Sequence, residues 1–296
     1  MEAPTTLPRK TREIRNHHLD SSIWNHFRFR PTDVVVASYP KSGTTWAQQI
    51  VGQLLTAGAE FPINKVSHWV DYRAAQQNRL AVLEAQKHRR ILKSHLPFDT
   101  LVYSPAAKYI YIARDGRDVV WSFHHIHINY GQAHFRMLND PPGLVGPPMG
   151  PADPNITEYF RRWMNEDGYP LWSFWDHVKS WWNVRDIPNV LLLHFDHLKR
   201  DLEGEMRRVG DFLGCDIPPD RWPSIVEHCT FEYMKRNAEK VAPLGAAFMQ
   251  GGRGAFINKG VNGRWRDVLT DEDIARYESL AREKLGDECA EWLAGR

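Results

Sequence analysis

The sequence has few cysteines, no long hydrophobic run and almost no net charge, and each shortage excludes a class of protein. Three cysteines in 296 residues, far apart and in no CxxC pair, exclude a disulfide framework and favour a reducing compartment. No apolar run approaches the roughly 18 residues that a membrane-spanning helix needs, and the charged first residues lack the apolar region of a signal peptide. We therefore expect a cytoplasmic protein without stable membrane insertion.

Charge is almost balanced, with 38 Lys and Arg against 36 Asp and Glu, so the formal net charge is only +2. This balance gives no general attraction to nucleic acid or to an anionic membrane, and we expect no nucleic-acid partner. Any anion that the protein binds must be held by a local site. Aromatic residues are in excess instead, at 12% of the chain with 12 Trp, more Trp than a core of this size needs.

Short β-branched runs alternate with longer helical patterns along the chain. Residues 33–38 (DVVVAS) are typical of a strand buried on both faces, and residues 44–55 follow as a helix. Similar short runs recur at residues 90–93, 108–113 and 190–195. The alternation predicts an α/β fold, a central and mainly parallel sheet flanked by helices, in a single domain over residues 1–296.

Two loop tracts interrupt this alternation without resembling domain linkers. Residues 130–155 become rich in Pro and Gly (DPPGLVGPPMGPADPN), a composition that excludes regular structure and a length typical of lids or binding loops. The second tract, GGRGAFINKGVNGRW, covers residues 251–265 and precedes a helix that Thr270 caps.

The turn YPKSGTTW, residues 39–46, joins the first predicted strand to its helix. Unpaired N–H groups, the positive end of a helix dipole and the Lys41 cation are what a phosphate-binding turn requires. The nucleoside-triphosphate signature GxxxxGK[ST] is absent, because Lys41 precedes the glycine. We predict an anion site; the alternative is an ordinary turn in which Thr44 or Thr45 caps the helix and Lys41 is solvated.

A second strand, turn and helix start surrounds Arg114. Ser122 follows eight residues later, about two helical turns away, so a forked guanidinium and a hydroxyl can converge on one tetrahedral anion. The alternative is that Arg114 pairs with Asp115 or Asp118 on the surface.

A candidate base follows the strand-like run that ends in KSHLP. His95 has an ordinary pKa near neutrality, which suits a group that takes a proton from an attacking hydroxyl, and Lys93 lies two residues before it. One His among 14 is more often structural than catalytic, so the prediction depends on this placement.

From about residue 29 to about residue 277, these motifs resemble the cytosolic-type sulfotransferase family, as a bacterial-like member. YPKSGTTW is similar to that family's 5′-phosphosulfate-binding loop. The family moves the sulfuryl group of 3′-phosphoadenosine 5′-phosphosulfate (PAPS) to a hydroxyl or amine, on an α/β fold related to P-loop nucleotide kinases. The resemblance implies a sulfotransferase that uses PAPS as co-substrate without a metal, by in-line transfer to a small aromatic, alcohol or lipid-like acceptor.

The resemblance also assigns roles to individual residues. His95 would be the catalytic base, with Lys41 and Lys93 beside the transferred group. The cofactor-binding positions would be Lys41, Ser42, Gly43, Thr44, Thr45, Trp46, Arg114, Ser122, Phe231, Phe256, Lys259 and Gly260. Arg114 and Ser122 would grip the 3′-phosphate, whereas Trp46, Phe231 and Phe256 would contact the adenine.

The later motifs depart from the family pattern in three places. Residues 251–266 would form the cofactor-closing loop, but Asn258 stands where the family usually has Arg, so we expect weaker cradling or a substitute cation from Arg253. The sequence HFDH at residues 194–197 replaces a Tyr followed by two acids, which puts an expected adenine hydrogen bond in doubt. The family's dimer motif is poorly matched at residues 266–271, and we do not predict that dimer.

For the acceptor we predict contacts from Tyr72, Tyr130 and His124, with residues 1–28 as an N-terminal extension and residues 130–155 as a lid. The four histidines at 124, 125, 127 and 134 could border this pocket or cap a helix, and no metal is expected because no acid or Cys completes a ligand set. Farther along, a stripe of Leu171, Trp175, Val178 and Trp182 predicts a helix facing the core. Two rival functions are a P-loop kinase-like phosphotransferase and a catalytically silent nucleotide-binding protein.

Overall fold

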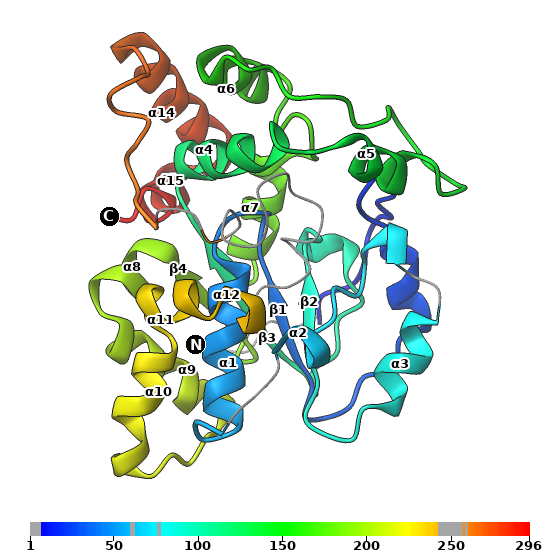
Figure 1. Cartoon of the computed structure of the whole chain (residues 1–296), viewed down its shortest axis with the longest axis vertical. Coiled ribbons are helices and arrows are strands. Elements are labelled where there is room, and N and C mark those ends of the chain that lie inside the picture. Colours follow the sequence, from blue (N-terminus) through cyan, green and yellow to red (C-terminus); the bar gives the residue numbers. More distant parts are fainter. Residues whose placement is uncertain (1–6, 60–62, 76–77, 242–256, 258–259) are drawn as a thin grey trace.

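The structure is a computed structural model that describes residues 7–59, 63–75, 78–241, 257 and 260–296. Its centre is a four-stranded parallel sheet in the order β2-β1-β3-β4 (Figure 1). Strand β1 (Val34–Ala37) pairs with β2 (Ile91–Ser94) on one side and with β3 (Lys108–Ala113) on the other, and β4 (Val190–His194) pairs with β3. All four strands lie within one residue of their predicted positions, which confirms the α/β prediction.

The two faces of the sheet bury different kinds of core, because successive strand side chains point to opposite faces. One face presents Val34, Val36, Ile91, Ile110, Ile112 and Leu193 to an aliphatic core. The opposite face presents Val35, Ala37, Leu92, Tyr109, Tyr111 and Ala113 to an aromatic core that includes Trp24, Trp163, Trp172, Trp175 and Trp181. The Trp excess of the sequence is therefore concentrated on one side of the sheet.

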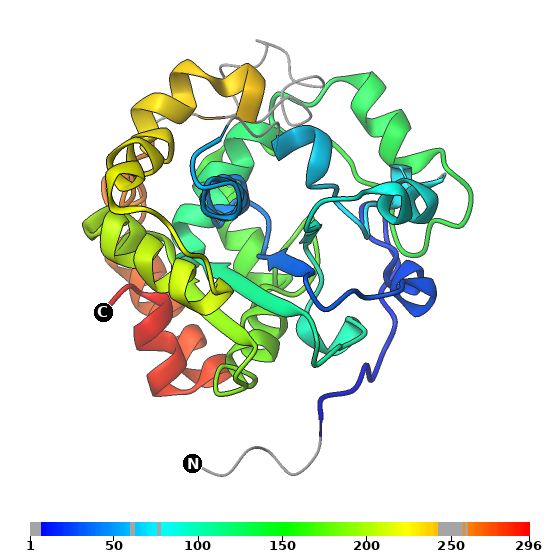
Figure 2. The same cartoon turned by 90° about the horizontal axis from the view of Figure 1, so that it is seen from below.

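Helices cover both faces (Figures 1 and 2). In Figure 2 helix α1, blue, is seen almost along its axis beside the strands. The aliphatic core takes residues from α1 (Thr44–Leu55), α2 (Ile63–Val66), α8 (Phe195–Arg200), α9 (Leu202–Leu213), α10 (Trp222–His228), α11 (Phe231–Arg236) and α12 (Ala238–Val241). The aromatic core takes them from α3 (Arg79–Ala85), α4 (Gly116–His127), α5 (Gln132–Asn139), α6 (Ile156–Asn165), α7 (Phe174–Trp182), α14 (Asp271–Leu285) and α15 (Asp287–Leu293).

Short 3₁₀ helices complete the architecture: η1 (Ser21–His26), η2 (Arg73–Ala75), η3 (Phe98–Thr100) and η4 (Pro219–Arg221). Helix α14 begins as predicted, because the Thr270 side chain accepts from the Asp273 N–H and the Asp273 carboxylate accepts from the Thr270 backbone. In the described part of the chain, no helix combines the length and apolar character needed to cross a membrane.

Two predictions about local structure need correction. The segment 130–155 is not irregular throughout, because its first third contains α5, and the Pro- and Gly-rich part begins after it. The helix on the Trp-rich segment begins later than its predicted stripe, although Leu171 and Trp182 at the two ends of the stripe both pack against the aromatic core. Ser173 caps α7 by accepting from the Asp176 N–H, so Leu171 lies before the helix, and Trp181 is fully buried whereas Trp182 is only partly buried.

Candidate active site

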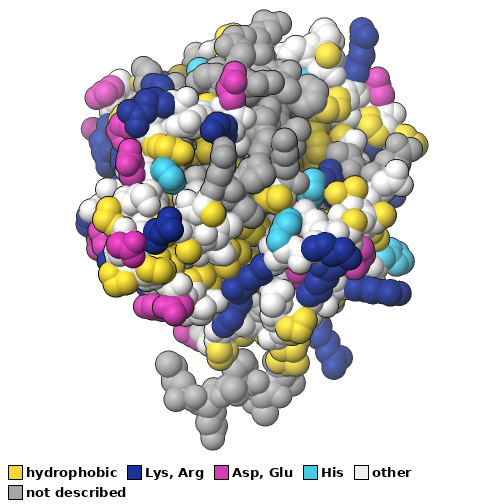
Figure 3. Space-filling model, turned by 60° about the horizontal axis from the view of Figure 1, so that its bottom comes forward, with side chains coloured by type: hydrophobic (Ala, Val, Ile, Leu, Met, Phe, Trp, Pro, Cys, Tyr) yellow, Lys and Arg dark blue, Asp and Glu magenta, His cyan; other side chains and the backbone are white. Residues whose placement is uncertain are grey.

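A cavity of about 900 Å³ opens where the carboxyl ends of the strands meet. Lys41 follows β1, His95 follows β2 and Arg114 follows β3, and all three line the cavity. Figure 3 shows one face of the molecule on which hydrophobic side chains gather near the middle, with Lys and Arg more frequent toward one side. Parallel α/β sheets bind their ligands at this edge, so the fold brings the predicted anion turns and the base to one place.

The backbone of the first turn is shaped for close approach. Gly43 has φ of 111°, and a Cβ there would lie 2.8 Å from Ile112 Cδ1 and 3.0 Å from Phe195 Cδ2, so only glycine fits without displacement. Gly43 is also the N-cap of α1 and makes no side-chain capping bond. Thr44 Oγ1 instead contacts Ser38 Oγ at 2.5 Å, and therefore the alternative in which a threonine caps the helix is wrong.

Ser42 takes a different place from its neighbours in this turn. Lys41, Gly43, Thr44, Thr45 and Trp46 all line the cavity. Ser42 is buried outside the cavity lining, and its N–H donates to the Tyr39 carbonyl at 3.2 Å. The N–H groups that follow Gly43 are thus the ones that this turn offers to an anion.

Two lysines in the cavity have lowered pKa values. Burial lowers the pKa of Lys41 to about 7, and the nearby Arg114 and Lys93 charges lower it further. Burial also lowers the pKa of Lys93 to about 8, although Asp71 opposes this shift. Lys41 is therefore not a solvated surface lysine. A bound anion would stabilise the positively charged form of Lys41.

His95 is fixed by its backbone surroundings. Its Nδ1 lies 2.7 Å from the Ser38 carbonyl oxygen, an atom that can only accept, so Nδ1 carries the proton and Nε2 keeps a lone pair. Burial, followed by the Lys93 charge, holds the pKa of His95 well below its usual value of 6.5. The ring packs edge-on against Trp69 with centroids 4.7 Å apart. A neutral imidazole in this tautomer is ready to accept a proton.

Arg114 lies across the cavity wall with its guanidinium 4.3 Å from the centre of the Phe195 ring. Its Nε and Nη2 donate to Asn262 Oδ1 at 3.1 and 2.5 Å, and Nη1 donates to the Lys41 carbonyl at 3.3 Å. Asp115 pairs with Arg117 at 2.6 Å, so the alternative of an Arg114–Asp115 surface pair is wrong. Ser122, eight residues farther along the chain on α4, also lines the cavity.

The adenine-side residues also meet here. Trp46 donates from Nε1 to the Cys229 carbonyl at 2.7 Å and packs edge-on against Phe195 at 5.2 Å between centroids. Phe231 lines the same wall and lies against Gly260, where a Cβ would come within 2.6 Å of its ring. The predicted residues Phe256 and Lys259 lie outside the described residues, as do Asn258 and Arg253.

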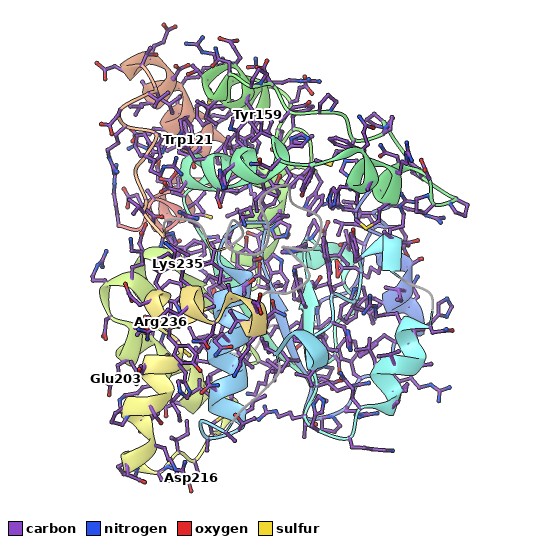
Figure 4. All side chains as sticks on the ribbon, in the orientation of Figure 1. Trp121, Tyr159, Glu203, Asp216, Lys235 and Arg236 are labelled. Atoms are coloured by element: carbon purple, nitrogen blue, oxygen red, sulfur yellow. The ribbon has the colours of Figure 1, made fainter. Side chains whose placement is uncertain are left out.

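Aromatic side chains form the other end of the cavity. Tyr72 stacks on Trp69 with centroids 4.4 Å apart and an angle of 17°. Tyr130 lies 3.8 Å from His134, between ring centroids, at the start of α5. Both tyrosines line the cavity, and Trp121 on α4 lines it too. Figure 4 labels Trp121 on α4 and Tyr159 on α6, both in the upper part of the view, with Asp216 at the bottom.

His124 does not reach this wall. Its Nε2 bonds to the Asp153 carbonyl at 2.8 Å, and it lies outside the cavity lining, whereas His134 of the same cluster is part of it. His127 is likewise occupied, with the Gly150 carbonyl 2.8 Å from its Nε2. Two histidines of the cluster thus tie the Pro- and Gly-rich segment to α4.

Arg73 fixes the same region from the opposite side. Its Nε donates to the Asn16 carbonyl at 2.8 Å, its Nη1 donates to the Pro141 carbonyl at 2.9 Å, and its Nη2 donates to the Leu138 carbonyl. One guanidinium therefore joins the N-terminal segment to the segment that follows α5.

Several lining residues have no clear signal in the sequence. His18, from the N-terminal segment, lines the cavity and lies 6.3 Å from both Trp69 and Tyr72 between ring centroids. Leu171 lines it from just before α7. Phe195 entered the sequence analysis only as the last residue of the predicted strand 190–195 and as part of HFDH, and Asn262 only as a member of the predicted closing loop, with no role of its own.

Comparison with known proteins gives a consistent picture. A family model described as the sulfotransferase domain matches residues 31–288. A glycolipid sulfotransferase from Mycobacterium bovis (strain BCG / Pasteur 1173P2) is 29% identical over 283 residues, covering 87% of this chain and 86% of the relative. Human sulfotransferase 1C2 is 29% identical over 270 residues, covering 88% and 85%.

The solved structure of retinol dehydratase in complex with retinol and PAP resembles this fold. Its TM-score is 0.68 at 27% identity, and the match covers 90% of this chain and 84% of that chain. The same protein in complex with androsterone and the inactive cofactor PAP gives a TM-score of 0.67 at 26% identity, with the same coverage.

Proposed function

The chain belongs to the sulfotransferase domain family and is a PAPS-dependent sulfotransferase, and from this premise we propose that it sulfates a hydroxyl on an apolar, lipid-like acceptor with His95 as general base. The family match extends over most of the chain, and the curated relatives match along most of their own length. The finer points of the proposal, the acceptor and the base, depend on the geometry of the cavity.

The residues of the cavity fit a nucleotide that carries anionic groups at both ends of its ribose. Lys41 and the α1 N-terminus would hold the 5′-phosphosulfate, and Arg114 with Ser122 would hold the 3′-phosphate. Trp46 and Phe231 offer aromatic surface for the adenine. PAPS, when bound, supplies the activated sulfuryl group and a phosphate leaving group.

The observation that carries the mechanism is the His95 Nδ1 contact with the Ser38 carbonyl at 2.7 Å. It leaves Nε2 as the basic atom in a residue that lines the cavity between the anion turn and the aromatic wall. His95 would take the acceptor hydroxyl proton at Nε2, while Lys41 and the N–H groups after Gly43 stabilise the negative charge that develops on the leaving oxygen. Lys93, two residues from His95, would orient the transferred group.

An apolar acceptor is supported by the composition of the remaining wall. Trp69, Tyr72 and Tyr130 are joined by Phe123 and Ile126 of α4 and by Met137 of α5. Burial raises the pKa of Tyr72 to about 12 and that of Tyr130 above its usual range, so both hydroxyls stay neutral. The names of related proteins refer to glycolipid, retinol and androsterone, all of which combine apolar bulk with hydroxyl chemistry.

The proposal includes three points of organisation. Residues 130–155 would act as the acceptor lid, residues 251–266 would close over the cofactor, and residues 1–28 would extend the acceptor wall through His18. A cytoplasmic location is supported by the three cysteines, which are all free thiols.

Transfer of radiolabelled sulfate from PAPS tests the function directly. We expect labelled product with a sterol, a long-chain alcohol or a glycolipid, and weaker labelling of a small charged phenol. Labelling of none of these acceptors, by a protein that binds PAP (adenosine 3′,5′-bisphosphate) in calorimetry, would favour the silent nucleotide-binding alternative. Transfer of the γ-phosphate of radiolabelled ATP to the same acceptors would favour the kinase-like alternative.

A further inference from the structure

Arg114 is held by three hydrogen bonds that leave part of its guanidinium available. The group has five N–H donors. Asn262 Oδ1 accepts from Nε at 3.1 Å and from Nη2 at 2.5 Å, and the Lys41 carbonyl accepts from Nη1 at 3.3 Å. With respect to the described residues, one N–H on Nη1 and one on Nη2 remain. Two N–H groups on different nitrogens of a guanidinium can bind a tetrahedral anion.

Asn262 is itself oriented by a carboxylate. Its Nδ2 donates to Asp196 Oδ1, so the amide presents its oxygen, and not its nitrogen, to Arg114. The flanking backbone is anchored as well. The Gly263 N–H donates to Asp118 Oδ1 at 2.7 Å, and Lys199 Nζ donates to the Gly260 carbonyl at 2.9 Å. The acceptor atom that faces Arg114 therefore has a fixed position.

The neutrality of Asn262 matters because Arg114 is only 8% exposed. A carboxylate at this position would form a buried ion pair and satisfy the charge of Arg114. An amide oxygen orients the guanidinium without adding a negative charge of its own. Arg264 also lines the cavity and repels Arg114, whereas the carboxylates of Asp118, Asp196 and Asp115 attract it and offset part of the positive charge.

We propose that Asn262 is a positioning residue that holds Arg114 by its Nε and Nη2 groups so that the remaining N–H groups on Nη1 and Nη2 bind the 3′-phosphate of the nucleotide. The inference rests on the proposed function, since it takes the Arg114 wall as the 3′-phosphate site. It assigns a role to a residue that the cofactor does not need to touch, and the aromatic face of Phe195, 4.3 Å from the guanidinium, provides the third constraint on Arg114.

The test compares two nucleotides that differ only in the group that Arg114 binds. Calorimetry measures the affinities of PAP and of AMP, which lacks the 3′-phosphate, for the wild type, Asn262→Asp and Asn262→Ala. We expect Asn262→Asp to weaken the binding of PAP by about tenfold or more, because the new carboxylate competes with the phosphate for the guanidinium. Asn262→Ala should weaken the binding of PAP several-fold, and both variants should bind AMP with an affinity within about twofold of the wild-type value.

The chain offers a matched control in Asn165, whose Oδ1 accepts from Arg276 Nη2 at 2.6 Å on the exposed surface. Asn165→Asp makes the same chemical change and should leave both affinities unaltered. Equal weakening of PAP and AMP by the Asn262 variants would assign Asn262 a merely structural role, and unchanged PAP affinity would remove any role in the site. Either result overturns this inference while leaving the sulfotransferase proposal intact, whereas a wild type that binds neither nucleotide overturns both.

Discussion

His95 is the side chain whose removal should separate chemistry from binding. We expect His95→Ala to lower kcat by about 10²–10⁴-fold, because it removes the proposed general base, while PAP affinity changes by less than about threefold. Steady-state sulfate transfer and calorimetry measure the two quantities. His26→Ala, at an exposed histidine in η1, serves as the control. A variant that turns over within threefold of wild type would disprove the base assignment.

The lowered pKa of Lys41 predicts proton uptake when the nucleotide binds. With a pKa of about 7, Lys41 is roughly nine-tenths neutral at pH 8 before the nucleotide binds, and an adjacent anion raises its pKa and restores its charge. We therefore expect PAP affinity to fall as pH rises from 7 to 9. Calorimetry at pH 8 in buffers of different ionisation enthalpy should show uptake approaching one proton.

Variants of Lys41 distinguish it from other lysines. Lys41→Arg should retain a cation and abolish most of the uptake, since arginine is already charged at pH 8. Lys179→Met, at an exposed lysine whose Nζ donates to the Lys284 carbonyl, should behave as wild type. Undiminished uptake in Lys41→Arg would instead place the titrating group elsewhere, with Lys93 as the next candidate.

At this scale the sequence predicted residues that belong to contiguous motifs and missed isolated ones. Lys41, Arg114 and His95 each follow a recognisable strand, and the parallel sheet places their positions at one edge. His18 has no such signal, and Asn262 lies in the predicted closing loop of residues 251–266 without a signal for its own role. Their roles arise from contacts with residues far along the chain, which no local spacing records.

The turn before α1 is an element whose backbone shape carries its function. We expect Gly43→Ala to lower the free energy of unfolding by about 2–3 kcal/mol, because alanine at φ of 111° is strained and its Cβ would press on Ile112 and Phe195. Displacement of Phe195 should also weaken PAP binding, since that ring supports Arg114. Thermal unfolding and calorimetry measure the two effects.

Gly146 provides a control for this substitution. It has φ of 84°, and a Cβ there would meet nothing within 4 Å. Gly146→Ala should therefore show only the backbone cost, about 1 kcal/mol, with unchanged PAP affinity. If both variants behaved alike, the close approach at Gly43 would have no energetic importance.

The elements themselves were predictable to different degrees. The strands were found because compact β-branched runs buried on both faces leave few alternatives. The start of the Trp-rich helix was predicted too early, because Ser173 caps it after Leu171, and Trp181 is the most deeply buried of its tryptophans although Trp182 packs against the core as well. Helix α5 was missed because the proline-rich residues that follow it dominate the composition of its segment.

Across the whole molecule, buried histidines predict sensitivity to mild acid. Burial lowers the pKa of His177 to about 3 and those of His127 and His134 to about 4, and it lowers those of His17, His18, His95 and His194 as well. In the unfolded chain these groups take up protons near the ordinary pKa of 6.5, whereas the native state does not. Each buried histidine therefore contributes stability above about pH 6.5, and this stability is lost as the pH falls from 6.5 toward the pKa of that histidine in the native state.

Two acids act in the opposite direction. Burial raises the pKa values of Asp71 and Asp118 to about 6, so the native state takes up these protons before the unfolded state and gains stability as pH falls from 6 toward 3.8. The histidines outnumber them, and we expect the thermal unfolding temperature to fall between pH 7 and pH 5. His177→Gln should reduce the slope of the free energy of unfolding against pH by up to about 1.4 kcal/mol per pH unit, and His26→Gln should leave that slope unchanged. A temperature that stays constant or rises would contradict this expectation.

The Arg73 contacts link the packing of two segments of the chain. One buried guanidinium bonds to carbonyl groups from the N-terminal segment and from the segment after α5, so neither segment can move away without breaking bonds to the same cation. Displacement of either segment therefore costs hydrogen bonds to Arg73. A change in the packing of one segment is passed to the other through this single side chain.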